Sequence, residues 1–132
     1  MEILKKIELS SFIDPRGDLV VIEENRHLPF CIKRIYYMFN LKPNEPRGFH
    51  AHKKTQQLAI CLRGSCDMLI DNGHEKMKIE MNNPKNGILI DRMVWHEMSN
   101  FSSDCLLLLL ASELYDENDY IRDYQIFLNN II

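Results

Sequence analysis

The segment from Met68 to Met81, MLIDNGHEKMKIEM, decides the fold class of this chain. Its centre, Asp71-Asn-Gly73, is a turn signal, because Asn and Gly tolerate the positive φ that tight turns require. The residues from Met77 to Met81 alternate apolar and polar side chains, which is typical of a strand with one buried face. The segment therefore predicts two antiparallel strands joined by a turn.

Similar turn signals recur at short intervals along the chain. They are Asp14-Pro-Arg-Gly17, Pro43-Asn-Glu-Pro46, Arg63-Gly64, Asn83-Pro84 and Asn86-Gly87. Between the turns lie short runs rich in β-forming residues, at 19–23, 32–39, 48–52, 57–62, 66–70, 77–81, 87–90 and 106–110. Strands that lack long helices between them cannot form parallel crossovers, so the sequence predicts an all-β sandwich or barrel.

The C-terminal segment has a different pattern. Its aromatic and apolar residues recur at helical spacing, at Tyr120, Tyr124, Phe127, Leu128 and Ile131. The acidic and Asn-rich residues 116–119 precede them and can cap a helix start. We expect one helix at residues 119–129, docked on the barrel, with its tyrosines acting as packing residues.

Length and charge limit the functions open to the chain. Its 132 residues, 15.6 kDa, predict a single domain spanning residues 1–132, with no room for a separate cofactor domain. Sixteen Lys and Arg against nineteen Asp and Glu give a net charge of −3. This balance argues against a nucleic-acid partner, because proteins that bind nucleic acid generally have an excess of basic residues.

The cysteines and the apolar runs indicate a cytoplasmic protein. Four cysteines form no C-x-x-C pair, and a chain this sparse in cysteine does not depend on disulfides. Lys5, Lys6 and Glu8 interrupt the N-terminal apolar residues, so we expect no secretory signal. The longest apolar run, 105–111, is far shorter than the roughly 20 residues that a membrane-spanning helix needs, so we expect no membrane partner.

The stretch RGFHAHKKTQQ, residues 47–57, carries the strongest candidate site. His50 and His52 are two residues apart, and a strand directs side chains at that spacing to the same face. Imidazole pairs of this kind often coordinate zinc, iron or manganese together with a third His and a carboxylate. His96, within the candidate strand 93–98, is the candidate third His.

The carboxylate of such a metal site is missing. Four and five residues after His52 the chain has Gln56 and Gln57, which supply neutral amides. Loss of the anionic ligand weakens the attraction for a dication and leaves an imidazole free to act as a base.

Cations near the two histidines indicate an anionic substrate. Arg47 lies three residues before His50, and Lys54 lies two residues after His52, in a chain that is acidic overall. Arginine can hold a phosphate through two N–H donors, so Arg47 is our candidate for phosphate binding, with Lys54 as a weaker one.

Five strings together resemble one known family. They are DPRGDLVVIEEN, PFCIKRIYY, EPRGFHAHKKTQQLAICLRGSC, VWHEMSNFSSDCLLLLLAS and YDENDYIRDY. In this order they are similar to the dTDP-sugar 3,4-ketoisomerases of the cupin superfamily. The resemblance implies a cupin jelly-roll barrel with a short C-terminal helix, acting as a homodimer without metal or another cofactor.

The resemblance also implies the reaction and its partners. The substrate is a dTDP-linked 4-keto-6-deoxyhexose, dTDP-4-keto-6-deoxy-D-glucose, whose carbonyl moves from C4 to C3. The product then serves a PLP-dependent aminotransferase in the biosynthesis of 3-amino-deoxysugars for lipopolysaccharide or another glycan. The homodimer forms through N-terminal strands, which the alternating segment Leu19–Ile22 could supply.

The family pattern assigns roles to the candidate residues. His50 is the base that moves the proton, and His52 orients it, polarises the carbonyl oxygens or relays the proton between them. Gln57 takes the former metal-ligand position and holds the sugar or His52, with Gln56 turned outward. Arg47 neutralises the diphosphate.

Two further pairs complete the predicted site. Only one of the adjacent Tyr36 and Tyr37 can face the cavity of a strand, and we favour Tyr36 with Arg34 on the same face. Arg16 and His96 together resemble the group of the family whose 3-keto product has the galacto configuration.

Three alternatives stay open at this stage. The first is a binding module that recruits a sugar nucleotide without turnover. The second is a metal-dependent cupin enzyme with His50, His52 and His96 as ligands. The third is a sugar-nucleotide 3,5-epimerase, because such enzymes share the Arg-Gly-x-His signature.

Overall fold

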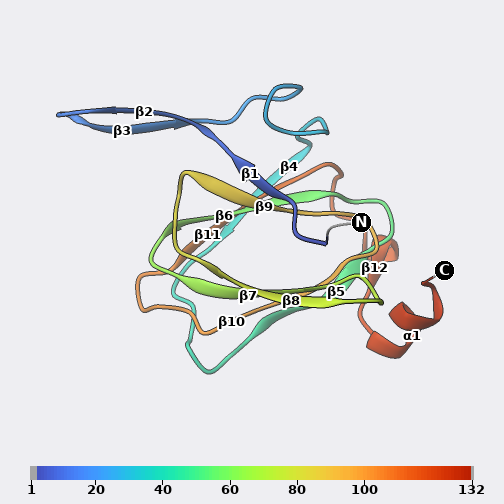
Figure 1. The fold of residues 1–132 in the computed structure, drawn as a ribbon. Helices are drawn as coiled ribbons and strands as arrows, with labels where there is room; N and C mark the ends of the chain where they lie inside the picture. The colour runs from blue at the N-terminus through green and yellow to red at the C-terminus, as the bar shows by residue number, and fades with distance from the viewer. Residues whose placement is uncertain (1–2, 132) are drawn as a thin grey trace.

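Two five-stranded sheets face each other in the computed structural model, which describes residues 3–131 (Figure 1). The first sheet has the order β1 (Lys6–Glu8), β9 (Asn86–Ile90), β6 (Gln57–Arg63), β11 (Leu106–Ala111) and β4 (Arg34–Met38). The second has the order β12 (Tyr120–Ile121), β5 (Arg47–His52), β10 (Trp95–Ser99), β7 (Cys66–Asp71) and β8 (Lys76–Met81). All neighbouring strands in both sheets are antiparallel, so the predicted all-β architecture is confirmed.

The turn that decided the fold class forms where it was predicted. β7 and β8 pair from Cys66↔Met81 to Asp71↔Lys76. Between them Gly73 adopts φ +90°, and its N–H donates to Asp71 Oδ1 at 2.8 Å. The carboxylate therefore closes the turn that Asn and Gly make possible.

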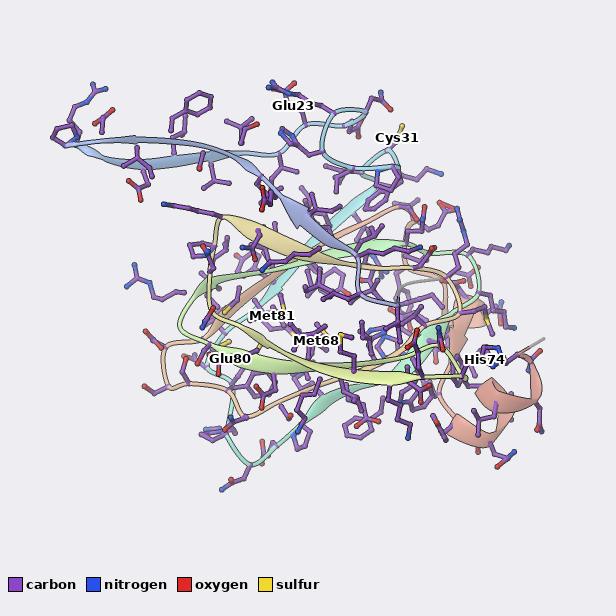
Figure 2. All side chains as sticks on the ribbon, viewed as in Figure 1. Glu23, Cys31, Met68, His74, Glu80 and Met81 are labelled. Atoms are coloured by element: carbon purple, nitrogen blue, oxygen red, sulfur yellow. The ribbon has the colours of Figure 1, made fainter. Side chains whose placement is uncertain are left out.

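The space between the two sheets is the main hydrophobic core. Met68 and Met81 lie there in Figure 2, and Leu107 and Leu109 enter from the opposite sheet. The outer face of the first sheet has a second core, in which Leu28 and Phe30 of the N-terminal segment cover Leu58 and Ile60. The barrel wall is thereby fixed on both sides at β6, which carries Gln57.

The helix expected at 119–129 is shorter than predicted. The observed α1 spans Tyr124–Asn129 and begins at Asp123, whose side chain accepts from Ile126 N. Before it, η1 (Glu117–Asp119) forms a 3-10 turn and β12 pairs with Ala51 and His52 of β5. Pairing with β5 keeps residues 120–121 extended, so tertiary contacts override the helical spacing there.

The hairpin of β2 (Ser10–Asp14) and β3 (Gly17–Val21) extends away from the barrel in Figure 1. Phe12, Ile13 and Leu19 on this hairpin are each about 60% exposed. Within the described residues 3–131, no helix is long and apolar enough to cross a membrane.

Candidate active site

Three imidazoles meet inside the barrel on two neighbouring strands. His50 and His52 lie on β5, and His96 on β10 is the register partner of His50. The ring centroids of His50 are 4.9 Å from His52 and 4.4 Å from His96, and ring nitrogens of all three lie within 4.8 Å of one another. The spacing of two in the sequence thus does place the pair on one face, and His96 joins it.

A bulge in β5 sets the direction of His50. The register shifts opposite His96 and Glu97, and Phe49 and Gly48 adopt φ +60° and +96°. A Cβ on Gly48 would lie 2.8 Å from the His96 carbonyl oxygen, so only glycine fits there. The bulge changes the direction of the strand between Arg47 and His50, and the His50 ring then lies beside His52 and His96.

Each imidazole is held through its Nδ1 atom. His50 Nδ1 is 3.0 Å from the Gly48 carbonyl oxygen, and His96 Nδ1 is 3.2 Å from that of Val94. His52 Nδ1 is 3.0 Å from Asp119 Oδ2. Carbonyl and carboxylate oxygens only accept, so Nδ1 carries the proton and Nε2 of each neutral ring is left with a lone pair.

Two of these lone pairs have no internal partner. His50 Nε2 and His52 Nε2 are buried and form no hydrogen bond with any other described residue. Buried polar atoms are nearly always satisfied, so the arrangement indicates a polar ligand between the rings. A neutral Nε2 can accept a proton from such a ligand or coordinate a metal ion.

Burial keeps the three rings neutral. It lowers the pKa of His50 to about 4, and it lowers the pKa of His52 although Asp119 acts in the opposite direction. Burial and the two neighbouring rings lower the pKa of His96 well below its ordinary value. At neutral pH the site therefore holds bases and not imidazolium ions.

These pKa shifts predict a loss of stability in mild acid. As the pH falls below about 6.5, the histidines protonate first in the unfolded chain, which then binds more protons than the folded one. We expect the free energy of unfolding to decrease from pH 7 to pH 5 by about 2 kcal/mol for His50 alone, whose pKa is about 4 in the folded chain, and His96 adds to this decrease. Urea unfolding at both pH values measures this, and an unchanged midpoint would contradict it.

Asp119 is a member of the site that the sequence assigned to a helix cap. Its carboxylate is buried and accepts from Lys54 N at 2.6 Å, Thr55 Oγ1 at 2.5 Å and His52 Nδ1 at 3.0 Å. Burial favours its neutral form, but the hydrogen bonds from Thr55, Lys54 and His52 outweigh burial and lower the pKa of Asp119. The anion fixes both the orientation and the tautomer of His52.

Polar side chains of the first sheet, on β4 and β6, lie opposite the strands that carry the imidazoles. Tyr36 on β4 donates a hydrogen bond to Gln57 Oε1 on β6, and burial raises the pKa of Tyr36. The Arg34 guanidinium lies 5.2 Å from the Tyr36 ring centroid. Gln57 Nε2 and Arg34 Nε are buried without a hydrogen-bond partner among residues 3–131. Tyr37 is 59% exposed, so of the two adjacent tyrosines the structure turns Tyr36 inward.

Tyr120 also belongs to the site, although helical spacing made it a packing residue. It is the register partner of His52, and its ring centroid is 4.4 Å from that of His52 and 4.9 Å from that of His50. The Arg122 guanidinium lies over the Tyr120 ring, 4.3 Å from its centroid, and forms an ion pair with Glu117 at 2.6 Å. Only the β12–β5 pairing reveals this position.

The side chains of three residues predicted for the site lie away from the imidazoles of the same chain. Arg16 is at the tip of the β2–β3 hairpin, where it pairs with Asp14 at 2.9 Å. Arg47 is exposed and lines a surface hollow with Lys42 and Phe49. Lys54 touches the site through its backbone, because its N–H binds Asp119, while its side chain is exposed.

Gln56 turns away from the imidazoles, as expected. Its side-chain amide donates to Asp91 Oδ1 at 3.0 Å. Of the two glutamines, Gln57 is therefore the one that points into the barrel.

Comparison with known proteins places the chain in a family. The family model described as WxcM-like, C-terminal, matches residues 2–131. The TDP-4-oxo-6-deoxy-alpha-D-glucose-3,4-oxoisomerase of Aneurinibacillus thermoaerophilus is 52% identical over 123 residues, which cover 93% of this chain and 88% of that protein. The chain belongs to this cupin family of sugar 3,4-ketoisomerases. It is an isomerase by this membership.

Solved structures of ketoisomerases agree with the fold. The enzyme of Thermoanaerobacterium thermosaccharolyticum, as a His-to-Asn mutant with TDP-4-keto-6-deoxyglucose, aligns with a TM-score of 0.95 at 39% identity, covering 99% of this chain and 95% of that one. The TDP-quinovose 3,4-ketoisomerase of Campylobacter jejuni aligns with a TM-score of 0.93 at 45% identity, covering 98% and 100%. The expected cupin barrel with one C-terminal helix is confirmed.

An epimerase shares the fold alone. The dTDP-6-deoxy-D-glucose-3,5-epimerase of Legionella pneumophila aligns with a TM-score of 0.79 but only 15% identity, covering 92% of this chain and 72% of that one. This likeness carries no argument for epimerase chemistry.

Proposed function

We propose that this ketoisomerase converts dTDP-4-keto-6-deoxy-D-glucose into dTDP-3-keto-6-deoxyhexose. One observation carries the proposal: the neutral rings of His50 and His52 present two buried Nε2 lone pairs that no other described residue satisfies. The relatives named for this sugar support the substrate class.

The geometry supports a simple proton transfer. Nε2 of His50 takes the proton from C3, and the electron pair of that bond moves to the C4 carbonyl, giving an enediol. O3 then loses its proton as the C3 carbonyl forms, and C4 receives a proton from His50. His52, oriented by Asp119, passes the proton between O3 and O4. Atoms and electrons balance without an external oxidant or reductant.

The polar groups opposite the histidines are suited to the developing charge. Tyr36 O–H holds the Gln57 amide through its Oε1, and the buried Nε2 of that amide can donate to the sugar oxygens of the enediol. Arg34, whose Nε is also buried without a partner in residues 3–131, supplies positive charge on the same side. We propose Arg47 and Lys54 as the residues that bind the diphosphate. Measuring the affinity of their Ala variants for dTDP tests this role, and we expect weaker binding.

Product configuration and pathway form the finer part of the proposal. We infer a galacto product from the combination of Arg16 and His96. The Campylobacter jejuni relative is named for a gluco sugar, quinovose, so overall identity does not decide this point. A ketone at C3 suits an aminotransferase of glycan biosynthesis, and the four free cysteines suit the reducing cytoplasm.

The exposed hairpin supports the proposal of a homodimer. Phe12 and Leu19 are cross-strand partners and project apolar side chains from a two-stranded ribbon, which is marginally stable alone. We infer that the β2–β3 hairpin packs on a second copy of the chain. Arg16 at its tip would then reach the partner's barrel, which accounts for its separation from the imidazoles of its own chain.

The dimer gives a direct prediction. The double variant Phe12→Glu and Leu19→Glu buries charge at the interface, so light scattering at micromolar concentration should show the mass of one chain, against two for the wild type. Ile126→Glu on α1 removes an equally exposed apolar residue and serves as the control that stays dimeric. A monomeric wild type would contradict the proposal.

A metal-dependent reaction is the second candidate. The ring nitrogens of His50, His52 and His96 lie within 4.8 Å of one another, which is compatible with three ligands of one ion. Gln57 would take the place of the carboxylate ligand in such a site, and because its amide is neutral we favour the reaction without metal.

The reaction run in D2O and followed by NMR tests the proposed function. Deuterium at C4 with the carbonyl at C3 is the expected result, and the product's C4 configuration is read from the same spectrum. Exchange at both C3 and C5 with the C4 ketone retained would show an epimerase, and unchanged substrate would show a binding module.

A further inference from the structure

Three cysteines form a second buried cluster that the proposed reaction does not use. Cys61 lies on β6, Cys66 begins β7, and Cys105 directly precedes β11. Their sulfur atoms lie within 4.8 Å of one another, and each residue is at most 3% exposed. Cys61 is four residues along β6 from Gln57, a separation of about 13 Å at the rise of a strand. The cluster is therefore distinct from the imidazole site.

The spacing of the sulfurs matches that around a metal ion. Zinc–sulfur bonds of about 2.3 Å in tetrahedral geometry place neighbouring sulfurs about 3.8 Å apart. The Sγ atoms of Cys61 and Cys105 are 3.9 Å apart. The third thiol needs only a small side-chain movement to complete a triangle around a shared ion.

The chemistry of the cluster also favours a cation. Its three ligand atoms are all thiol sulfurs, and all three residues are buried. Thiophilic ions displace the protons of such thiols when they bind.

The cluster lies at the end of the barrel where turns reach the surface. Arg63 in the β6–β7 turn and Asp104 beside Cys105 are exposed, and Gly64 is half-buried. The three thiols are thus one to two residues along the chain from side chains in contact with solvent.

We propose that Cys61, Cys66 and Cys105 bind one thiophilic d10 cation, Zn²⁺ or Cu⁺. Within residues 3–131 the cluster has no His, Asp or Glu as a fourth member, so the three sulfurs provide the protein ligands. Soft thiolates select these ions over Mg²⁺ or Ca²⁺. The bound ion would join β6, β7 and the start of β11, so its effect is on stability and not on turnover.

Titration of reduced, chelator-treated protein with Co²⁺, as a spectroscopic substitute for Zn²⁺, and with Cu⁺ tests this proposal. We expect a sulfur-to-metal charge-transfer band that saturates at one ion per chain and a higher Tm with metal bound. Such a band requires sulfur ligands, so binding at the imidazoles does not produce it. Competition with chelators of known affinity then decides between Zn²⁺ and Cu⁺.

Matched variants assign the site. Cys66→Ser should lose the band, while Cys31→Ser, which changes the exposed cysteine outside the cluster, should keep it. If Cys66→Ser unfolds, thiol labelling of the wild type replaces it: metal should slow modification of three cysteines and leave Cys31 unaffected. Absence of a charge-transfer band with both ions, or a folded Cys66→Ser protein with the band unchanged, would overturn the proposal.

Discussion

Replacing His50 by asparagine should reduce kcat by about 10²- to 10⁴-fold, the range that a positioned general base contributes. Asparagine keeps the polarity of the position but has no basic nitrogen to take the proton from C3. Binding of dTDP, measured by calorimetry, should change little, because the loss lies in the chemical step. Steady-state kinetics with the 4-keto sugar nucleotide measures the effect.

His74→Asn is the matched control for this substitution. His74 lies at the exposed turn between β7 and β8 (Figure 2) and is not a member of the imidazole cluster. We expect wild-type kinetics from it. Wild-type turnover by His50→Asn would show that another group is the base and that the proposed mechanism is wrong.

Asp119→Asn should lower kcat by about 10²- to 10³-fold through His52, because a lost carboxylate partner permits the wrong imidazole tautomer. The carboxylate accepts three hydrogen bonds, whereas the amide cannot accept from all three donors in the same geometry. Asp119 is a positioning residue, so KM should change far less than kcat, and the pH profile of kcat should shift as His52 loses its anionic partner.

Asp116→Asn provides the comparison for Asp119. Asp116 caps η1 three residues earlier in the same acidic cluster and is exposed. It should retain wild-type kcat. If Asp119→Asn lowers the free energy of unfolding but leaves kcat and its pH profile unchanged, its role is structural only.

The central part of the site could be predicted from local pattern. A strand alternates its side chains, so the spacing of His50 and His52 and of Arg34 and Tyr36 already fixed which residues share a face. His96 was also predicted from the sequence, and the pairing of β10 with β5 places it next to His50. The two-residue alternation of side chains is sufficient to predict which residues share a face wherever a strand is regular.

The remaining site residues depend on contacts between distant segments. Tyr120 fits a helical repeat, and only pairing with β5 makes it extended and turns its ring to His52. Asp119 reaches the same histidine for the same reason. Arg47 lies beyond the bulge at Phe49, where simple alternation no longer predicts direction. Arg16 is at the tip of a hairpin that extends away from the barrel, so its place in the site depends on the proposed dimer.

Turnover by metal-stripped protein tests the account most directly. Protein treated with chelator is assayed with the 4-keto sugar nucleotide, and its metal content is measured in the same sample. We predict that the stripped wild type and stripped Cys66→Ser both keep the kcat of untreated wild-type protein, although each holds far less than one ion per chain. Loss of activity that returns in both proteins on addition of one cation per chain would contradict proton transfer by the imidazoles alone.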